Sequence, residues 1–423
     1  MFRLTVFIIV SGLQFLLYTR AQRWARARFP GGTKARVILA APFVLSSLAL
    51  IIMLFAGSIA SRLPGWLIAA AATPFYIWEG GTIALGLVIF AGMLLAAPVR
   101  LAGAALKRIP LTAPAYKRAA VHPAVVRFDG SRRAFLLRGM EGVAAVSFGG
   151  AAYGMVAGRA GYEFTETTIP VPRLPAALDG FTIGLLSDIH SSTFMTKKQM
   201  DVYCKAVMAL GTDIIVIPGD FVNSQTEEVY PFAESFSALR APGGVYGVMG
   251  NHDFYAPDPE RVAREVDGCG VKLLRNDNMI IAKNGARLAL IGIDDVGRPD
   301  RAAAHMQSAA RGVPDMLPRI LLCHRPYFLE QASSLRMDLV LSGHTHGGQI
   351  VLGHIGAVAL TPAALASPYV WGRYSRGNTQ MYVSRGIGTV GLPMRINCPP
   401  EITRITLRRA QNVPESDPHA QHV

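Results

Sequence analysis

The chain has 423 residues, 51% of them hydrophobic, and a formal net charge of +14. Its mean hydropathy of +0.31 is higher than a wholly soluble protein usually shows. The charge is unevenly divided: residues 1–160 hold 18 Lys and Arg against 3 Asp and Glu, whereas residues 161–423 hold 24 against 25. The basic residues therefore accompany the hydrophobic half and indicate membrane topology. They argue against a basic nucleic-acid-binding face on the second half, so no nucleic-acid partner is expected.

Residues 1–158 are predicted to form a transmembrane region of three or four helices. Three apolar stretches follow one another, at 4–18, 37–57 and 65–99. The first is short for a membrane span, and the third is interrupted at Glu79-Gly80-Gly81. The third stretch is therefore either one span over 82–98 behind an interfacial segment, or two short spans.

Two segments of this region, residues 20–36 and 100–142, are rich in arginine and lysine. The positive-inside rule places both in the cytoplasm. That placement favours a single crossing by residues 65–99 and leaves the chain after about residue 160 outside the cytoplasm, periplasmic or extracellular. If residues 65–99 cross twice, the second half of the chain is cytoplasmic instead.

A twin-arginine-like motif lies deep in the first half of the chain. Residues 131–137 read Ser-Arg-Arg-Ala-Phe-Leu-Leu, and a weakly apolar run rich in Gly and Ala follows at 143–158. This pattern is typical of a twin-arginine export signal. An ordinary transmembrane helix with basic residues on its cytoplasmic side explains it equally, and both interpretations give the same orientation.

The second half predicts a layered α/β domain over residues 181–409, after a linker and edge strand at 159–180. Strands are expected to alternate with helices at 197–210, 228–240, 258–267 and 299–311. Apolar runs on both sides of Lys283-Asn284-Gly285 predict a hairpin with an Asn-Gly turn. Closing strands are expected at 381–384 and 402–407, a loop over 350–380 and a disordered tail over 410–423.

Five apolar runs in the second half each end in residues that can ligate a metal. A short apolar run predicts a buried strand, and ligand sites in open α/β sheets lie just beyond the carboxyl ends of the strands. The run ends supply seven candidate ligands, which are Asp188, His190, Asp220, Asn251, His324, His344 and His346. Taken singly, such residues are explained as helix caps, turn residues or polar loop residues. Those explanations would require a separate coincidence at each of the five strand ends. The sequence therefore predicts a two-metal site.

The spacing of the candidate ligands suits metal binding. Asp188 and His190 stand at positions i and i+2, which point to the same side of an extended backbone. His344 and His346 repeat this spacing, and the two oxygens of Asp220 can bridge two ions. Mixed carboxylate and imidazole ligation suits Mn, Fe or Zn better than Ca.

The set Asp-x-His, Gly-Asp, Gly-Asn-His-Asp, His and Gly-His-Thr-His resembles the calcineurin-like metallophosphoesterase superfamily. The resemblance implies a layered αββα domain that hydrolyses phosphoesters with two divalent metal ions. It implies that one ion is held by Asp188, His190, Asp220 and His346, and the other by Asp220, Asn251, His324 and His344. It further implies that His252 is the general acid, or the cation that stabilises the transition state, with Asp253 as its orienting partner.

Three further segments, at 343–349, 384–388 and 399–402, resemble membrane-associated bacterial phosphodiesterases with an N-terminal transmembrane or twin-arginine region. This implies a multi-pass protein of the bacterial inner membrane that cleaves phosphodiester or pyrophosphate bonds in a lipid- or envelope-related substrate. Some such relatives hydrolyse UDP-2,3-diacylglucosamine in lipid A synthesis. That substrate is cytoplasmic and fits the second orientation, so this activity stays an alternative.

A transporter-like membrane protein with a non-catalytic regulatory domain is the alternative of another class. Transport pathways usually carry ionisable residues within the membrane, and Glu79 is the exception in apolar stretches that hold few of them. A non-catalytic domain would moreover be expected to have lost a ligand or the acid, and the motifs retain all of them.

Three arginines, Arg325, Arg385 and Arg395, are candidates for contacting a phosphate or acidic head group, and each is equally explained as a salt-bridge partner. Of the three, Arg385 is the predicted substrate-binding residue. Trp371 and Tyr374 lie among apolar patches that predict either a lip facing substrate or membrane, or a packed loop.

Overall fold

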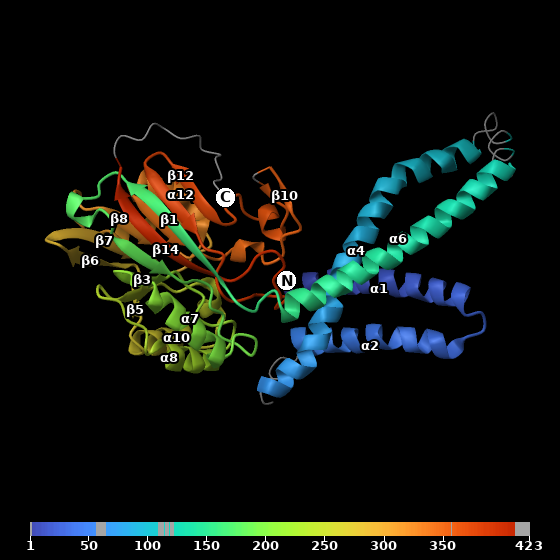
Figure 1. The fold of residues 1–423 in the computed structure, drawn as a ribbon, viewed down its shortest axis with the longest axis horizontal. Helices are drawn as coiled ribbons and strands as arrows, with labels where there is room; N and C mark the ends of the chain where they lie inside the picture. Colours follow the sequence, from blue (N-terminus) through green and yellow to red (C-terminus); the bar gives the residue numbers. More distant parts are fainter. Residues whose placement is uncertain are drawn as a thin grey trace. The chain divides into compact units, whose positions relative to one another are not determined.

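The computed structural model describes residues 2–55, 65–108, 114, 118, 122–356 and 358–410. The chain divides into two compact units, Met1–Met155 and Val156–Val423 (Figure 1). The predicted disordered tail, apart from its first residue, lies outside the described residues.

The first unit consists, in its described part, of long helices. They are α1 (Phe2–Arg28), α2 (Thr33–Phe55), α4 (Gly65–Arg108) and α6 (Pro123–Val156). Among the described residues, three helical segments are long and apolar enough to cross a membrane: Leu4–Arg28, Thr33–Met53 and Leu67–Arg108. Their outward side chains are mostly large and apolar, as a lipid environment requires.

The stretch predicted as either one span or two forms a single continuous helix, α4. It runs through Pro74 and Pro98 without ending. Gly81 allows close packing, because a Cβ at this position would lie 2.3 Å from the Phe148 ring of α6.

The twin-arginine-like motif lies within α6, and so does the Gly- and Ala-rich run that follows it, up to Val156. The side chains of Arg132 and Arg133 are outside the described residues. In the described part of α6, Phe148 packs against Trp78 with ring centroids 5.3 Å apart.

A buried polar cluster joins α1, α2 and α4. Gln14 Nε2 donates to Glu79 Oε1 at 2.6 Å, and the Ser46 hydroxyl donates to the same oxygen. The Ser47 hydroxyl donates to Gln14 Oε1 at 2.7 Å. Polar groups among apolar helices are costly unless they bond to one another, so the cluster specifies which helix faces meet.

The second unit is a sandwich of two six-stranded sheets. The first sheet has the order β1-β14-β2-β3-β4-β5, and the second has the order β12-β13-β9-β8-β7-β6. In the first sheet the strands are β1 (Glu163–Val171), β2 (Thr182–Leu185), β3 (Ile214–Ile217), β4 (Val245–Gly247), β5 (Lys272–Leu273) and β14 (Glu401–Arg409). In the second they are β6 (Asp277–Lys283), β7 (Ala286–Gly292), β8 (Arg319–Leu322), β9 (Leu339–Ser342), β12 (Gly372–Arg376) and β13 (Thr379–Val383). A small separate hairpin is formed by β10 (His354–Ile355) and β11 (Val358–Ala359).

Strands β2 to β5 are parallel, and so are β7, β8, β9 and β13. Their side chains alternate between the two faces, which is why continuous apolar runs form them. In β3, for example, Ile214 and Val216 face the second sheet, whereas Ile215 and Ile217 face the helices. The space between the sheets is filled by aliphatic residues from both, including Leu185, Leu290 and Leu341.

Helices cover both outer faces, which completes four layers (Figure 1). The first sheet packs against α7 (Lys197–Ala209), α8 (Val229–Phe236) and α10 (Pro259–Gly268). The second packs against α11 (Pro299–Ala309) and α12 (Leu329–Ser334). Short α9 (Asn251–Tyr255) follows β4 directly.

The layered αββα prediction is therefore confirmed, and all five ligand-bearing runs form strands. The predicted hairpin is β6–β7, with Asn284 and Gly285 in left-handed conformations at φ 54° and 77°. The loop expected over 350–380 is wrong in part, because it contains β12 and the β10–β11 hairpin. These strands are short and lie at edges, where the sequence lacks a continuous apolar run.

Candidate metal centre

The predicted ligands all follow strand ends, and the structure brings them together from both sheets. Asp188 and His190 follow β2, Asp220 follows β3 and Asn251 follows β4. From the second sheet, His324 follows β8, and His344 and His346 follow β9. Because these five strands are parallel within their sheets and their carboxyl ends meet at one edge of the sandwich, residues up to 158 positions apart in sequence become neighbours.

Five of these seven residues have a backbone in the left-handed region. The φ angles are 52° at Asp188, 49° at His190, 58° at Asp220, 73° at His344 and 54° at His346. Residues other than glycine rarely adopt this conformation, and Asp and His are among those that tolerate it best. Such conformations cluster at functional sites, where the surrounding structure enforces them. Here each one turns the chain sharply after a strand and aims a side chain inward.

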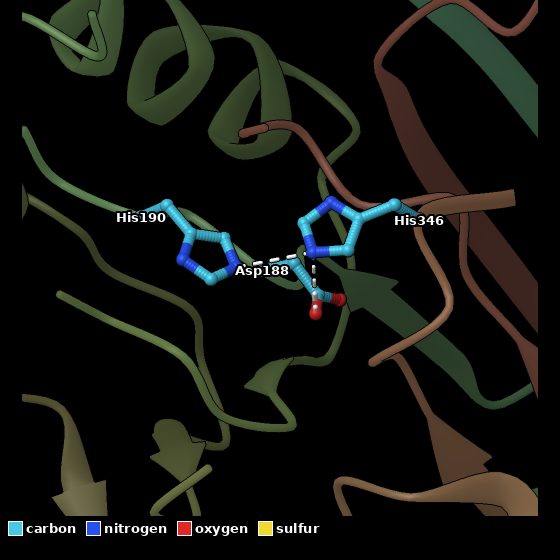
Figure 2. A group of neighbouring side chains, drawn as sticks. All are labelled: Asp188, His190 and His346. Atoms are coloured by element: carbon cyan, nitrogen blue, oxygen red, sulfur yellow. Dashed lines mark hydrogen bonds and ion pairs between the residues drawn. The ribbon is translucent and has the colours of Figure 1, made fainter. Parts of the chain in front are cut away.

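The side-chain donor atoms lie within contact distance of one another. His190 Nε2 is 3.1 Å from His346 Nε2, and His346 Nε2 is 3.5 Å from Asp188 Oδ1 (Figure 2). His190 Nε2 is also 3.4 Å from Asp220 Oδ2. Figure 2 shows the two imidazoles and the carboxylate converging on one small volume. Asp188, His190 and His346 therefore form one candidate metal-binding group.

A second group adjoins the first through Asp220. His324 Nε2 is 3.2 Å from Asp220 Oδ2 and 3.1 Å from Asn251 Oδ1. His344 Nδ1 is 3.2 Å from His324 Nε2. Asp220 Oδ2 thus lies between His190 and His324, which is the position that a bridging carboxylate requires.

The ionisation of these groups fits metal ligation. Burial lowers the pKa of His190 to about 3 and that of His344 to about 2, and it also lowers the pKa of His346. These three imidazoles are therefore neutral at physiological pH, which is the form that binds metals. Burial alone would raise the pKa of Asp220, but the neighbouring His324 holds it well below its usual range.

His324 is oriented by the backbone. Its Nδ1 lies 2.8 Å from the carbonyl oxygen of Pro218. A carbonyl only accepts hydrogen bonds, so Nδ1 carries a proton and Nε2 faces the site. Burial opposes a second proton, but the Asp220 carboxylate outweighs it and raises the pKa of His324 to about 10. As a metal ligand, His324 would offer Nε2 without a proton.

His252 lies at the edge of the two groups, on α9. Its backbone N–H donates to Asp220 Oδ1 at 2.8 Å, and its ring centroid is 4.6 Å from that of His190. Its Nδ1 lies 2.5 Å from the carbonyl oxygen of Asn223 and must therefore be the protonated nitrogen. This leaves Nε2 of the half-buried ring to exchange a proton with a bound molecule.

Asp253 does not occupy the position expected of it. Its carboxylate accepts hydrogen bonds from the backbone N–H groups of Asp220, Phe221, Val222 and Gly250, at 2.8–3.1 Å. The imidazole of His252 is oriented by the Asn223 carbonyl instead. The reason is that Asp253 points beneath the loop after β3, so it positions the loop that carries Asp220 and not the acid.

Arg385, the predicted substrate-binding residue, forms ion pairs with two glutamates. The guanidinium lies 3.0 Å from Glu163 Oε2 and 3.6 Å from Glu401 Oε1, and the side chain is mostly buried. Arg325 forms a two-point ion pair with Asp295. For both residues the structure shows the salt-bridge partner.

Arg395 has a structural role that nothing in the sequence indicated. It is fully buried and donates to the carbonyl oxygens of Arg385, Gly386, Gly388 and Cys398 at 2.7–3.1 Å. The loop that it organises in turn fixes the backbone of Asp188, because Gly388 N–H donates to Asp188 O at 2.8 Å. A buried arginine that bonds to carbonyls has no sequence signature, since its partners are main-chain atoms.

Two glycines allow the ligand loops to approach one another. A Cβ at Gly343 would lie 2.0 Å from Ser187 Oγ and 2.1 Å from Asp188 Oδ2. A Cβ at Gly250 would lie 2.2 Å from Asp220 Oδ1. A methyl group at either position would displace a ligand carboxylate.

The residues present therefore fit a dinuclear divalent metal centre. Neutral imidazoles and carboxylates converge on adjacent points, with Asp188, His190 and His346 in one group and Asp188, Asp220 and His324 in another. Mixed nitrogen and oxygen ligation of this kind suits transition metals.

Comparison with known proteins agrees with this geometry. Residues 181–348 match the family model described as calcineurin-like phosphoesterase. The uncharacterized metallophosphoesterase YkuE of Bacillus subtilis is 31% identical over 290 residues, which cover 66% of this chain and 98% of that protein. The chain belongs to the calcineurin-like metallophosphoesterase family.

Two other relatives are similar to part of the chain. The transmembrane protein with metallophosphoesterase domain of Danio rerio is 34% identical over 271 residues, covering 62% of this chain and 60% of that protein. The phosphodiesterase YaeI of Escherichia coli is 27% identical over 232 residues, covering 54% of this chain and 82% of that protein. The chain thus spans about 60% of the length of the Danio rerio relative.

Gly343→Ala is expected to weaken metal binding by about 10–100-fold, because the new methyl group displaces the Asp188 carboxylate. Gly268→Ala is the matched control, since a Cβ there meets nothing within 4 Å. Metal titration of the two variants, with bound metal measured by mass spectrometry, checks this. Equal metal affinity in both would show that the close approach at Gly343 is not required.

Asp253→Asn is expected to lower the stability of the metal-free protein by about 1–3 kcal/mol, because an amide replaces a carboxylate that satisfies several buried N–H groups. Thermal unfolding in the presence of a chelator measures this effect. Asp267→Asn is the control, because exposed Asp267 accepts from the single backbone N–H of Leu273. A variant that lost turnover at unchanged metal-free stability would restore the role of Asp253 in orienting the acid.

Proposed function

We propose that this protein is a membrane-anchored phosphohydrolase that cleaves phosphodiester or pyrophosphate bonds at a dinuclear metal centre. The observation that carries the proposal is the convergence of seven ligand side chains, with Asp220 Oδ2 lying 3.4 Å from His190 Nε2 and 3.2 Å from His324 Nε2. Two adjacent ligand groups that share one carboxylate are the arrangement a two-metal hydrolase needs.

We assign one metal ion to Asp188, His190, Asp220 and His346, and the other to Asp220, Asn251, His324 and His344. The mixed donor set supports Mn, Fe or Zn at both positions. When bound, such ions activate water as a nucleophile and neutralise charge on the phosphoryl oxygens.

The protein's own groups contribute orientation and proton transfer. The Pro218 carbonyl holds His324 in the tautomer that directs Nε2 to the site. The Asn223 carbonyl does the same for His252, whose Nε2 can give a proton to the leaving oxygen. Asp253 secures the loop of Asp220, so that the shared carboxylate keeps its place between the two groups.

A lipid- or envelope-related substrate is the finer part of the proposal. The helices that can cross a membrane support it, because they hold the hydrolase unit at a bilayer. A phosphodiesterase among the relatives supports phosphodiester cleavage. Cleavage of UDP-2,3-diacylglucosamine is the pyrophosphatase alternative, and a panel of lipid phosphodiesters and nucleotide-sugar diphosphates distinguishes the two.

Asp220→Ala is expected to abolish both metal binding and hydrolysis of bis-p-nitrophenyl phosphate by the full-length protein in detergent with added Mn²⁺. His252→Ala is expected to keep the metals and lose about 10²–10⁴-fold in turnover of a substrate with a poor leaving group, since it removes proton transfer. Steady-state kinetics with parallel metal analysis measure both effects. His305→Ala, a histidine on α11, is the matched control. Full activity of His252→Ala on the poor leaving group would refute the acid assignment.

We further propose that the hydrolase unit lies outside the cytoplasm of a bacterial inner-membrane protein. The basic segments 20–36 and 100–142, and the continuity of α4, support this orientation, which requires that α6 also crosses the bilayer, after the second basic segment. A C-terminal alkaline phosphatase fusion is expected to be active in a bacterial host, and a C-terminal green fluorescent protein fusion dark. The same reporters placed at Gly31, between α1 and α2, should give the opposite pattern. A fluorescent C-terminal fusion would place the unit in the cytoplasm and reopen the nucleotide-sugar alternative.

A further inference from the structure

Residues 350–372 form an uncharged segment within the otherwise charged hydrolase unit. They contain no Asp, Glu, Lys or Arg. The segment includes the β10–β11 hairpin and a short 3₁₀ helix, Pro362–Leu365. We call residues 350–371 the apolar flap; all of them except residue 357 are described.

The flap exposes large apolar side chains on one short stretch of chain. The exposed fraction is 93% for Leu365, 77% for Leu352, 69% for Ile355 and 55% for Val358. Single exposed apolar residues are ordinary, but several within fourteen consecutive residues and with no charge among them are not. Such a surface indicates that something apolar covers it.

Buried residues and backbone hydrogen bonds nevertheless hold the flap in one conformation. Val351 and Ala359 are buried with Cys398, and Trp371 packs against them. Leu352 N–H donates to Leu360 O at 2.9 Å, and Leu360 N–H donates to Gly353 O at 2.8 Å. The hairpin therefore presents its exposed side chains from a fixed base, apart from the two main sheets (Figure 1).

The flap is attached to the loop that carries the candidate metal ligands at two places, Val370 near its C-terminal end and Thr361 in its middle. The Thr345 hydroxyl, between His344 and His346, donates to Val370 O at 2.5 Å. Thr361 packs so closely on Gly348 that a Cβ there would lie 1.7 Å from its hydroxyl oxygen. A molecule or surface that fixes the position of the flap therefore also fixes the position of the loop that carries His344 and His346.

The occupant that best fits this surface is a lipid bilayer. The same chain carries three helical segments able to cross a membrane, and only a short connection, from Val156 to β1, joins that unit to the hydrolase unit. The hydrolase unit is thus tethered close to a bilayer. The absence of charge and the tryptophan at the base suit the interfacial region, where apolar side chains insert and aromatic rings lie at the level of the head groups.

We propose that the apolar flap inserts into the surface of the bilayer and holds the metal centre at the level of the lipid head groups. The insertion is a property of the surface and does not depend on the hydrolase assignment. It adds to that assignment a reason why a phosphoester in a lipid head group, held at the membrane, would meet this site.

The test uses the full-length protein in vesicles of phosphatidylcholine and phosphatidylglycerol, with a spin label at Leu365→Cys. Cys269 is replaced by serine, because Cys204, Cys323 and Cys398 are buried and will not label. Insertion predicts a several-fold higher ratio of oxygen to nickel-chelate accessibility than at Met316→Cys. Met316 is the matched control, since it is 85% exposed and precedes β8, at the edge opposite the ligands.

Ile355→Asp with Leu352→Asp, in the Leu365→Cys background, is expected to lower the accessibility ratio to the value at Met316→Cys. Each new charge opposes insertion. The loss of one large aliphatic side chain from the bilayer alone lowers the partitioning of the flap from water into the bilayer by at least about tenfold. Ile355→Leu should keep the ratio high. Unchanged metal content in all variants confirms that they are folded.

Three results would overturn the proposal. A Leu365→Cys ratio equal to that of Met316→Cys in vesicles would show that the flap stays in water. Spin–spin broadening that grows with protein density would identify a second copy of the chain as the occupant. Protection from both reagents in detergent as well as in vesicles would show that the chain covers its own flap.

Discussion

The candidate metal centre depends on sharp reversals of the backbone after three of the five ligand-bearing strands, β2, β3 and β9. Five ligand residues adopt left-handed φ angles, from 49° at His190 to 73° at His344. Each such residue costs on the order of 1–3 kcal/mol, and it persists because the parallel strands behind it are buried on both faces. If these residues relaxed to right-handed or extended conformations, their side chains would leave the shared volume. The two rigid sheets therefore hold the strained backbone of these residues in place.

Electrostatics adds a second requirement to the same centre. Burial keeps three of the imidazoles neutral, whereas Asp220 stays ionised because His324 lies beside it. Main-chain atoms do most of the orienting: carbonyls of Pro218 and Asn223 set two tautomers, and four N–H groups hold Asp253. Backbone groups suit this task because they are fixed by the fold and bring no net charge into a buried site.

The hydrolase unit and the helical unit follow different solvation rules within one chain. In the helices, apolar side chains face outward and the polar residues Gln14, Ser46 and Glu79 face one another. In the hydrolase unit apolar residues face inward, and the apolar flap is a marked departure from this rule. Because Thr345 attaches the flap to the ligand loop, the position of the flap bears on the candidate site as well as on solubility.

The sequence by itself determined the layered fold, the five ligand-bearing strands and their shared edge, because apolar periodicity and strand-end residues are local properties. The Asn-Gly hairpin was likewise readable, since its turn needs residues that accept a positive φ. Tertiary structure alone decided the partners. In the folded chain the Asp253 carboxylate accepts from backbone amides and not from the His252 ring. Arg385 pairs with Glu163 and Glu401, and Arg395 donates to main-chain carbonyls. It also kept α4 as one helix through Glu79-Gly80-Gly81, and it placed the Phe148 ring where Gly81 has no Cβ. Such choices depend on which atoms meet in space across tens or hundreds of residues, and a pattern along the chain does not contain that information.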